Sequence, residues 1–317
     1  MDKNVTLLFP GQGSQYVGMG KELANHSSFR FIELADQQLP YSLTSIMLEG
    51  PADQLQQTQN TQPAILAHSY ALYNQVTQLL KLRNVDVARV MGHSVGEYAA
   101  LVVAGAIDFA DAIKAVHLRG RLMQEAASPG SGKMYALLKA PLEKVEQACE
   151  ESSNPASKVM IANFNSPEQL VISGHAAACE RAITWLDKNV IGKYRAVELK
   201  VSAPFHCHMM KGAAAKMEAA IEHFSIQPTN TPYVANIDAK EYPIGLNPKI
   251  IAANLVAQID SPVLWSKSIE QLSDDTICLE VGPGKVLTGL AKKINPKLRV
   301  IPLDSPTAID ELEDILS

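Results

Sequence analysis

The sequence predicts an α/β protein in which a large core with a parallel sheet carries a small inserted α+β subdomain. Three observations lead to this prediction. Strand and helix patterns alternate from the N-terminus to residue 128, which is typical of parallel sheets covered by helices. The alternation changes after Pro129-Gly130-Ser131-Gly132. A serine flanked by two glycines stands between a strand pattern and a helix pattern, at position 94.

The first part of the chain supplies most of the core. A short apolar strand pattern at residues 5–9 ends in a Gly-rich turn at residues 10–15. The second strand pattern covers residues 85–91. Helical patterns cover residues 61–80, 95–104 and 108–127. Strand patterns at residues 233–236 and 277–281 return the chain to the same sheet.

The middle of the chain follows a different order of elements. Strand patterns lie at residues 134–138, 159–163, 170–173 and 194–201, and helical patterns at residues 142–151 and 176–188. The order βαββαβ is that of a ferredoxin-like unit. We therefore assign residues 129–203 to a small ferredoxin-like subdomain, and residues 1–128 and 204–317 to the core.

Residues 92–96, Gly-His-Ser-Val-Gly, have the spacing G-x-S-x-G. A sharp turn from a strand into a helix holds the central serine in a strained conformation, and glycines on both sides leave room for the neighbouring chain. An ordinary serine in a Gly-rich turn is the alternative. The strand and helix patterns on either side favour a nucleophile elbow, and with it a hydrolase-like core.

Composition excludes several classes of protein. The 317 residues have a net charge of −5, which argues against nucleic acid as a partner. The most apolar run, residues 98–107, is about half the length of a membrane span. The N-terminus has no signal-peptide core. Four cysteines without paired spacing indicate reduced thiols, and we expect a cytoplasmic protein.

A serine nucleophile needs a base, and histidine is the usual one. The segment Ser202-Ala203-Pro204-Phe205-His206-Cys207-His208 returns the chain to the core, so His206 and His208 are the best placed of the eight histidines. A metal site is the alternative use of His206-Cys207-His208, but no second cluster of ligands accompanies it. The local pattern does not choose between His206 and His208.

Arg119 lies on the apolar face of its predicted helix. Asp108 is an expected N-cap, and Ala112, Val116, Arg119 and Met123 then share one face. A buried guanidinium stays charged and requires an anion. The anion is either an internal carboxylate or the carboxylate of a substrate, and helical spacing leaves both open.

Together these residues resemble a known family. Eight motifs carry the resemblance: FPGQGSQ (9–15), TQPA (61–64), GHSVGE (92–97), HLRGRLM (117–123), NFNSP (163–167), PFHCHMM (204–210), SPVLW (261–265) and EVGPGKVL (280–287). Nearly the whole chain resembles malonyl-CoA:acyl carrier protein transacylases and the free-standing acyltransferases of polyketide synthases. Several motifs in one order are far more specific than any one alone.

The resemblance implies a role for particular residues. Ser94 corresponds to the nucleophile and His206 to its base. Arg119 corresponds to the arginine that holds the malonyl carboxylate. The backbone N–H groups of Gln12 and Val95 correspond to the oxyanion hole.

The resemblance also implies a set of supporting residues. The backbone carbonyl of Gln258 would orient the histidine. Gln62, Met123 and Phe205 would line the acyl pocket, and Asn163 and Asn165 would contact pantetheine. Phe205 matches the malonyl-selecting form of its position, whereas Pro204 and Ala203 are not the family's commonest residues, which leaves the extender selectivity open.

The function implied is transfer of a malonyl group from malonyl-CoA to the phosphopantetheine thiol of an acyl carrier protein, through a serine ester. We expect no cofactor, no metal, no membrane or nucleic-acid partner, and a monomer. An acyl hydrolase that clears carrier proteins is the alternative, and Arg119 argues against it, because simple acyl chains offer no anion. A non-catalytic docking module is disfavoured by the presence of both Ser94 and His206.

Overall fold

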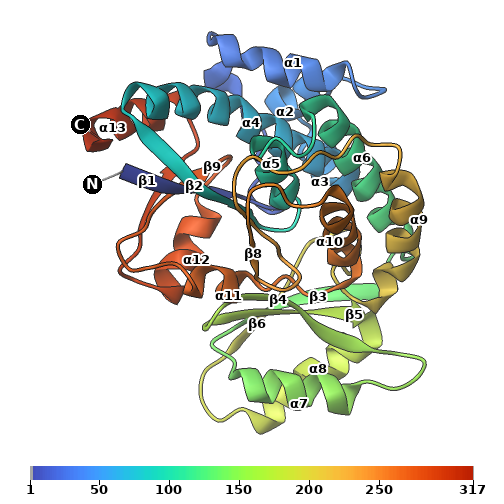
Figure 1. The fold of residues 1–317 in the computed structure, drawn as a ribbon. Coiled ribbons are helices and arrows are strands. Elements are labelled where there is room, and N and C mark those ends of the chain that lie inside the picture. The colour runs from blue at the N-terminus through green and yellow to red at the C-terminus, as the bar shows by residue number, and fades with distance from the viewer. Residues whose placement is uncertain (1–2, 317) are drawn as a thin grey trace.

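The computed structural model describes residues 3–316 and has an α/β fold with two sheets (Figure 1). The larger sheet has six strands in the order β10-β9-β1-β2-β7-β8. Its strands are β1 (Lys3–Phe9), β2 (Val85–Gly92), β7 (Tyr233–Val234), β8 (Glu241–Tyr242), β9 (Ile277–Val281) and β10 (Arg299–Leu303). All neighbouring strands run parallel except β7 and β8. The expected parallel sheet is therefore mixed, because a short hairpin adds β8 at one edge.

Most helices cover the large sheet and connect its strands, whereas α7 and α8 cover the small sheet described below (Figure 1). They are α1 (Arg30–Asp36), α2 (Leu43–Glu49), α3 (Ala52–Gln56), α4 (Thr58–Leu82), α5 (Gly96–Val103), α6 (Phe109–Glu125), α7 (Leu142–Ser152), α8 (Ala176–Asn189), α9 (Lys211–Ile221), α10 (Pro248–Asp260), α11 (Trp265–Glu270), α12 (Val286–Ile294) and α13 (Pro306–Leu316), with 3-10 turns η1 (Lys21–Leu23), η2 (Ser27–Phe29) and η3 (His208–Met210). The predicted helices correspond to α4, α5, α6, α7 and α8 within a few residues. Asp108 caps α6 as predicted, since its Oδ1 accepts from Ala110 N at 2.9 Å.

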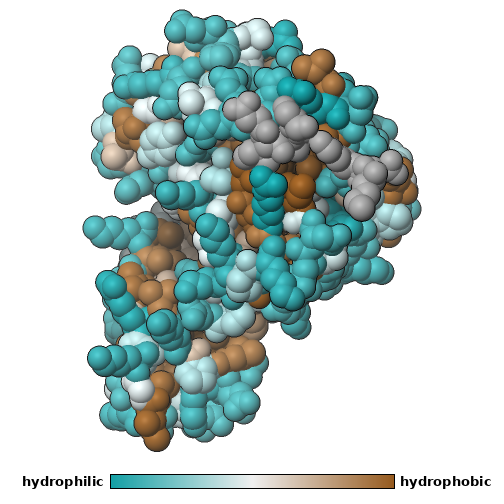
Figure 2. Space-filling view, turned by 90° about the vertical axis from the view of Figure 1, so that its left-hand side faces the viewer, coloured by the Kyte–Doolittle hydropathy of each residue, from teal (hydrophilic) through white to brown (hydrophobic). Residues whose placement is uncertain are grey.

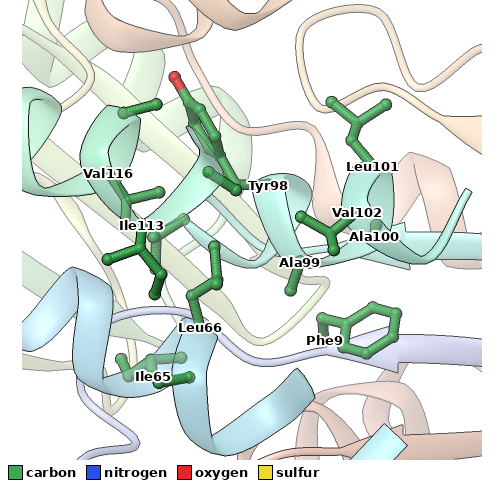
Figure 3. Close-up of a cluster of buried hydrophobic side chains, with 14 of the residues drawn as sticks. Phe9, Ile65, Leu66, Tyr98, Ala99, Ala100, Leu101, Val102, Ile113 and Val116 are labelled. Carbon is green, nitrogen blue, oxygen red and sulfur yellow. The ribbon is translucent and has the colours of Figure 1, made fainter. Parts of the chain in front are cut away.

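Both faces of the large sheet are buried. Along β1, Leu7 and Phe9 face the main core, whereas Leu8 faces a second core against α11 and α12. This alternation is the period of two that a strand imposes on its side chains. Figure 3 shows part of the main core, with Phe9 from β1, Ile65 and Leu66 from α4, Tyr98, Ala99, Ala100, Leu101 and Val102 from α5, and Ile113 and Val116 from α6. Sheet and helices thus hold the end of β2 and the start of α5 in a rigid frame.

The smaller sheet is antiparallel, with the strand order β4-β5-β3-β6. Its strands are β3 (Gly132–Leu138), β4 (Val159–Ser166), β5 (Gln169–His175) and β6 (Arg195–Glu198). The order β3-α7-β4-β5-α8-β6 confirms the predicted βαββαβ sequence of elements. One face packs on α7 and α8 through residues such as Leu137 and Ile172, and the other contributes Ala136 and Val171 to the main core.

Candidate active site

The turn from β2 into α5 holds Ser94 in a left-handed conformation, with φ of 53°. A Cβ added to Gly92 would lie 2.0 Å from the carbonyl carbon of Gly96, and one added to Gly96 would lie 2.1 Å from Phe9 O. No side chain fits at either position, because such contacts are far inside van der Waals distance. The structure confirms the predicted strand–turn–helix context of the G-x-S-x-G motif.

His206 faces Ser94 across the site. Its Nε2 lies 2.8 Å from Ser94 Oγ, and its Nδ1 lies 2.8 Å from Gln258 O. The carbonyl accepts only from a protonated Nδ1, so Nε2 is left as the acceptor for the serine hydroxyl. Burial, and then the charge of Arg119, lowers the pKa of His206 to about 3. The imidazole is therefore neutral at pH 7, as a base must be before it accepts a proton.

The other members of the His-Cys-His motif point elsewhere. Cys207 Sγ donates to Pro204 O at 3.1 Å, and His208 Nε2 lies 3.2 Å from His175 Nδ1. The described residues contain no group of three or more side chains that could hold a metal ion. The tertiary fold therefore distinguishes the two histidines that the local pattern left equal.

Arg119 is fully buried on α6 and reaches the same point. Its Nη1 donates to Gln62 Oε1 at 2.8 Å, and its Nη2 donates to Gln258 Oε1 at 2.7 Å and to Ser94 Oγ at 3.2 Å. None of the ion pairs within the described part of the chain includes Arg119. Its Nε is buried with no hydrogen-bond partner among the described residues. The guanidinium thus contacts neutral acceptors only.

These groups open into a cavity of about 220 Å³ between the two sheets. The predicted site residues that line it are Gln12, Gln62, Ser94, Arg119, Met123, Asn163, Asn165, Phe205 and His206. Gln62 Nε2 donates to Met123 Sδ at 3.8 Å, which joins two of the predicted acyl-pocket residues. Asn165 Oδ1 lies 2.8 Å from His93 Nε2, so this asparagine has a protein partner at the cavity wall. Val286, Leu287 and Leu290 of α12 complete an apolar wall.

The two predicted oxyanion-hole residues flank Ser94. Gln12 lies in the turn after β1, and Val95 is the N-cap of α5. Neither backbone N–H donates to a protein acceptor among residues 3–316. Gln12 lines the cavity, whereas Val95 is buried directly after Ser94 in the chain.

Sequence reasoning missed two residues that support the turn. Asn236 Oδ1 accepts from Ser94 N at 2.7 Å, and Asn236 Nδ2 donates to Gly92 O at 2.7 Å. Glu97 is fully buried behind Ser94 and accepts from Gln258 Nε2. Asn236 could have been suspected, since it ends a predicted strand, and carboxyl ends of neighbouring parallel strands meet at one edge of the sheet.

Comparison with known proteins agrees with this geometry. Residues 6–295 match the acyl transferase domain family. A malonyl CoA-acyl carrier protein transacylase of Haemophilus influenzae is 39% identical over 99% of both chains. The solved structure of the malonyl CoA-acyl carrier protein transacylase from Coxiella burnetii has a TM-score of 0.92 and 34% identity, and covers 100% of this chain and 98% of its own.

A second solved structure contains a partner. It holds a type II PKS acyl-carrier protein in complex with its malonyl-transacylase, at a TM-score of 0.90 and 36% identity over 99% of both chains. Family match, sequence identity and structural similarity all extend over nearly the whole length. The chain therefore belongs to the acyl transferase family, together with the malonyl CoA-acyl carrier protein transacylases.

Proposed function

We propose that this protein transfers a malonyl group from malonyl-CoA to the phosphopantetheine thiol of an acyl carrier protein, through an ester on Ser94. One observation carries the proposal. The fully buried Arg119 has no carboxylate partner among the described residues and lies 3.2 Å from Ser94 Oγ, which itself lies 2.8 Å from His206 Nε2. A cation beside a nucleophile selects an acyl group that carries its own carboxylate.

In the first step, Ser94 Oγ attacks the thioester carbonyl carbon of malonyl-CoA while His206 Nε2 accepts the hydroxyl proton. The carbonyl π bond opens, and the negative charge on its oxygen is stabilised by the N–H groups of Gln12 and Val95. The tetrahedral intermediate then collapses, the C–S bond breaks, and His206 returns the proton to the CoA thiolate. The malonyl ester of Ser94 remains.

The second step is the reverse reaction with a new thiol. The phosphopantetheine thiol of the carrier protein gives its proton to His206 and attacks the ester carbonyl. Collapse breaks the C–O bond to Ser94, and His206 returns the proton to Oγ. The solved complex of a related transacylase with its acyl-carrier protein supports this choice of acceptor.

The other predicted site residues are assigned supporting roles in this proposal. Gln62 orients Arg119 from one side, and with Met123 and Phe205 it bounds the space for a short acyl group. Asn163 and Asn165 line the same cavity from β4, and in this proposal they would contact the pantetheine arm. Gln258 orients His206 through its backbone carbonyl.

The proposed function assigns the two sheets to two parts of one enzyme. Residues 1–128 and 204–317 form a hydrolase-like core that carries Ser94, His206 and Arg119. Residues 129–203 form a ferredoxin-like subdomain, an assignment supported by the strand order β4-β5-β3-β6 with α7 and α8 on one face. The acyl group would then bind between them.

Intact-mass measurement after brief incubation with malonyl-CoA tests the proposal. The wild-type protein gains one malonyl group, and Ser94→Ala gains none at an unchanged melting temperature. A malonyl adduct on another residue of Ser94→Ala would disprove the assignment. If a carrier protein is present and free malonate is nevertheless released as fast as malonyl is transferred, the protein is instead a hydrolase.

The two histidines provide an internal comparison. His206→Ala lowers the rate of malonyl transfer by about 10²-fold or more, as loss of a general base does. His208→Ala, which loses only its contact with His175, keeps a rate within about threefold of the wild type. Equal losses in the two variants would contradict the role of His206.

A further inference from the structure

We infer that Glu97 is a positioning residue for malonyl recognition, which acts by fixing the side-chain amide of Gln258 against the guanidinium of Arg119. The inference rests on the proposed function and deepens it. It predicts that selectivity for acyl thioesters with a free carboxylate depends on a buried acid that does not touch the substrate. The geometry around Gln258 provides the argument.

The Gln258 amide lies between a guanidinium and a carboxyl group. Its Oε1 accepts from Arg119 Nη2 at 2.7 Å, and its Nε2 donates to Glu97 Oε2. All three side chains are fully buried. The amide therefore links the side chains of Arg119 and Glu97, which form no direct ion pair within the described part of the chain.

The surroundings of Nε2 allow only one orientation of this amide. Besides Glu97, Nε2 faces Ser94 O at 3.0 Å and Asn236 Oδ1 at 3.3 Å, and both can only accept. A reversed amide would place its oxygen against three acceptors and its NH₂ group against the guanidinium. Glu97 is the only carboxyl group of the three acceptors, and in its ionised form it accepts a hydrogen bond about twice as strong as a neutral one.

Glu97 is itself held in place from behind. Tyr233 donates its hydroxyl to Glu97 Oε1 at 2.9 Å, and Asn254 Nδ2 donates to that hydroxyl at 3.1 Å. Burial raises the pKa of Glu97 to about 7, while the hydrogen bonds from Tyr233, Gln258 and Asn236 and the charge of Arg119 act in the opposite direction. Asn254 and Gln258 both lie on α10, so this helix is connected to the carboxylate at two points.

The backbone and the side chain of Gln258 have separate tasks. The backbone carbonyl orients His206 and belongs to α10, so it stays in place when the side chain changes. The side chain orients Arg119. Loss of Glu97 should therefore leave the chemistry of Ser94 and His206 intact and weaken only the recognition of the substrate carboxylate.

The test compares malonyl and acetyl loading in Glu97→Gln and Glu97→Ala, by intact mass against time. We expect Glu97→Ala to lower kcat/KM for malonyl-CoA by about tenfold or more, mainly through a higher KM, and acetyl loading to change by less than about threefold. Glu97→Gln, which keeps an oxygen for Gln258 to donate to, should lie between Glu97→Ala and the wild type. Equal losses for both thioesters would overturn the inference.

A double-mutant cycle shows whether Glu97 acts through Gln258. Gln258→Leu removes the amide and keeps the backbone carbonyl that His206 needs. If the acid acts through this amide, Glu97→Gln has little further effect on the malonyl-to-acetyl ratio in the Gln258→Leu background. If the effects of the two substitutions on the malonyl-to-acetyl ratio simply add, the inference is overturned. The cycle uses Glu97→Gln, so it can be completed even if Glu97→Ala does not fold.

Glu280→Gln is the matched control for losing a buried carboxylate. Glu280 is fully buried, but it accepts from Leu287 N and Thr288 N at the start of α12. Its substitution should lower the melting temperature without changing the malonyl-to-acetyl ratio. If the wild type loads malonyl but Glu97→Ala has the same malonyl-to-acetyl ratio as the wild type, the inference is rejected and the proposed function stands. A wild type that loads no malonyl would reject the proposed function.

Discussion

At the scale of single residues, the site places one cation and one base within hydrogen-bonding distance of the same nucleophile. Arg119 Nη2 and His206 Nε2 lie 3.2 Å and 2.8 Å from the same Ser94 Oγ. Burial first, and the nearby guanidinium second, disfavour the protonated form of His206 and lower its pKa. The same charge that would bind the substrate carboxylate therefore adds to the effect of burial, which keeps the base neutral in the free protein.

Arg119→Ala should invert the preference between malonyl-CoA and acetyl-CoA. Loss of a buried charged contact with the malonyl carboxylate lowers malonyl loading by about 10²-fold or more. Acetyl loading should stay level or rise, because an acetyl group leaves the wild-type guanidinium unpaired. Loading rates for both thioesters measure this effect. Arg121→Ala, on an exposed part of the same helix, is the control and should change neither rate. Parallel losses for both substrates would contradict the carboxylate role.

The pKa of His206 predicts the pH dependence of loading. The base works only when neutral, so activity is lost as falling pH protonates it, and a lowered pKa moves that loss to lower pH. We expect kcat/KM for acetyl-CoA, whose loading does not depend on Glu97, to fall less than about twofold between pH 7 and pH 5.5, where an ordinary histidine would lose about tenfold. Arg119→Ala removes the positive charge beside His206, so the fall of activity in acid should move toward pH 6.5 when it is measured with acetyl-CoA. An acid limb near pH 6.5 in the wild type would contradict this expectation.

At the scale of elements, the turn between β2 and α5 depends on close contact with β1. Gly96 lies against Phe9 O, and α5 starts only because no side chain is present there. The α12 residues that line the cavity follow β9, and the N–H groups of Leu287 and Thr288 in the first turn of α12 donate to Glu280 of β9. The contacts of α5 with β1 and of α12 with β9 thus hold two parts of the cavity wall, and strands β3, β4 and β5 of the small sheet supply others.

Gly96→Ala should destabilise the protein by about 3 kcal/mol or more, because its Cβ would collide with backbone that cannot move away. Gly289→Ala is the matched control. Gly289 lies on the exposed side of α12, and a Cβ there meets no atom within 4 Å. Alanine should stabilise that helix by about 0.5–1 kcal/mol. Denaturant unfolding of the two variants measures the difference, and equal stabilities would contradict the argument.

At the scale of the whole molecule, the site is the place where two sheets meet. The small antiparallel sheet packs one face on α7 and α8, and the other contributes to the main core. In Figure 2 the molecule narrows between a larger upper part and a smaller lower part, and polar side chains cover most of the surface with apolar patches between them. No helix in the described part of the chain is long and apolar enough to cross a membrane.

The whole fold should lose stability in acid because it buries neutral histidines. His68 on α4 is fully buried, neither ring nitrogen has a partner among the described residues, and burial lowers its pKa to about 4. The folded state then binds fewer protons than the unfolded one. The contribution of the neutral His68 to the free energy of unfolding is fully present above pH 6.5. As pH falls toward 4, the protein loses roughly 3 kcal/mol of this free energy.

His68→Leu should therefore reduce the acid sensitivity of the melting temperature. The difference in Tm between the variant and the wild type should grow in favour of the variant as pH falls from 7 to 4. His223→Leu changes an exposed histidine and is the control, for which no such trend is expected. Melting curves of the variant and the wild type that stay parallel over this range would show that His68 does not contribute.

The sequence by itself determined the local features of this protein. The serine turn, the Asp108 cap and the βαββαβ order follow from short-range patterns, because glycine spacing, capping and strand or helix periodicity act between residues close in the chain. The buried position of Arg119 also followed from helical spacing. For these elements, the structure moved the boundaries by only a few residues.

Only the tertiary structure decided which distant residues meet at Ser94. His206 lies 112 positions from Ser94, and nothing in His206-Cys207-His208 itself shows which histidine turns inward. The contacts of Ser94 with Asn236 and of Glu97 with Gln258 span 142 and 161 positions. Such pairs form because separate strands and helices converge at one edge of a sheet, and the position of that edge is a property of the packed chain rather than of any segment.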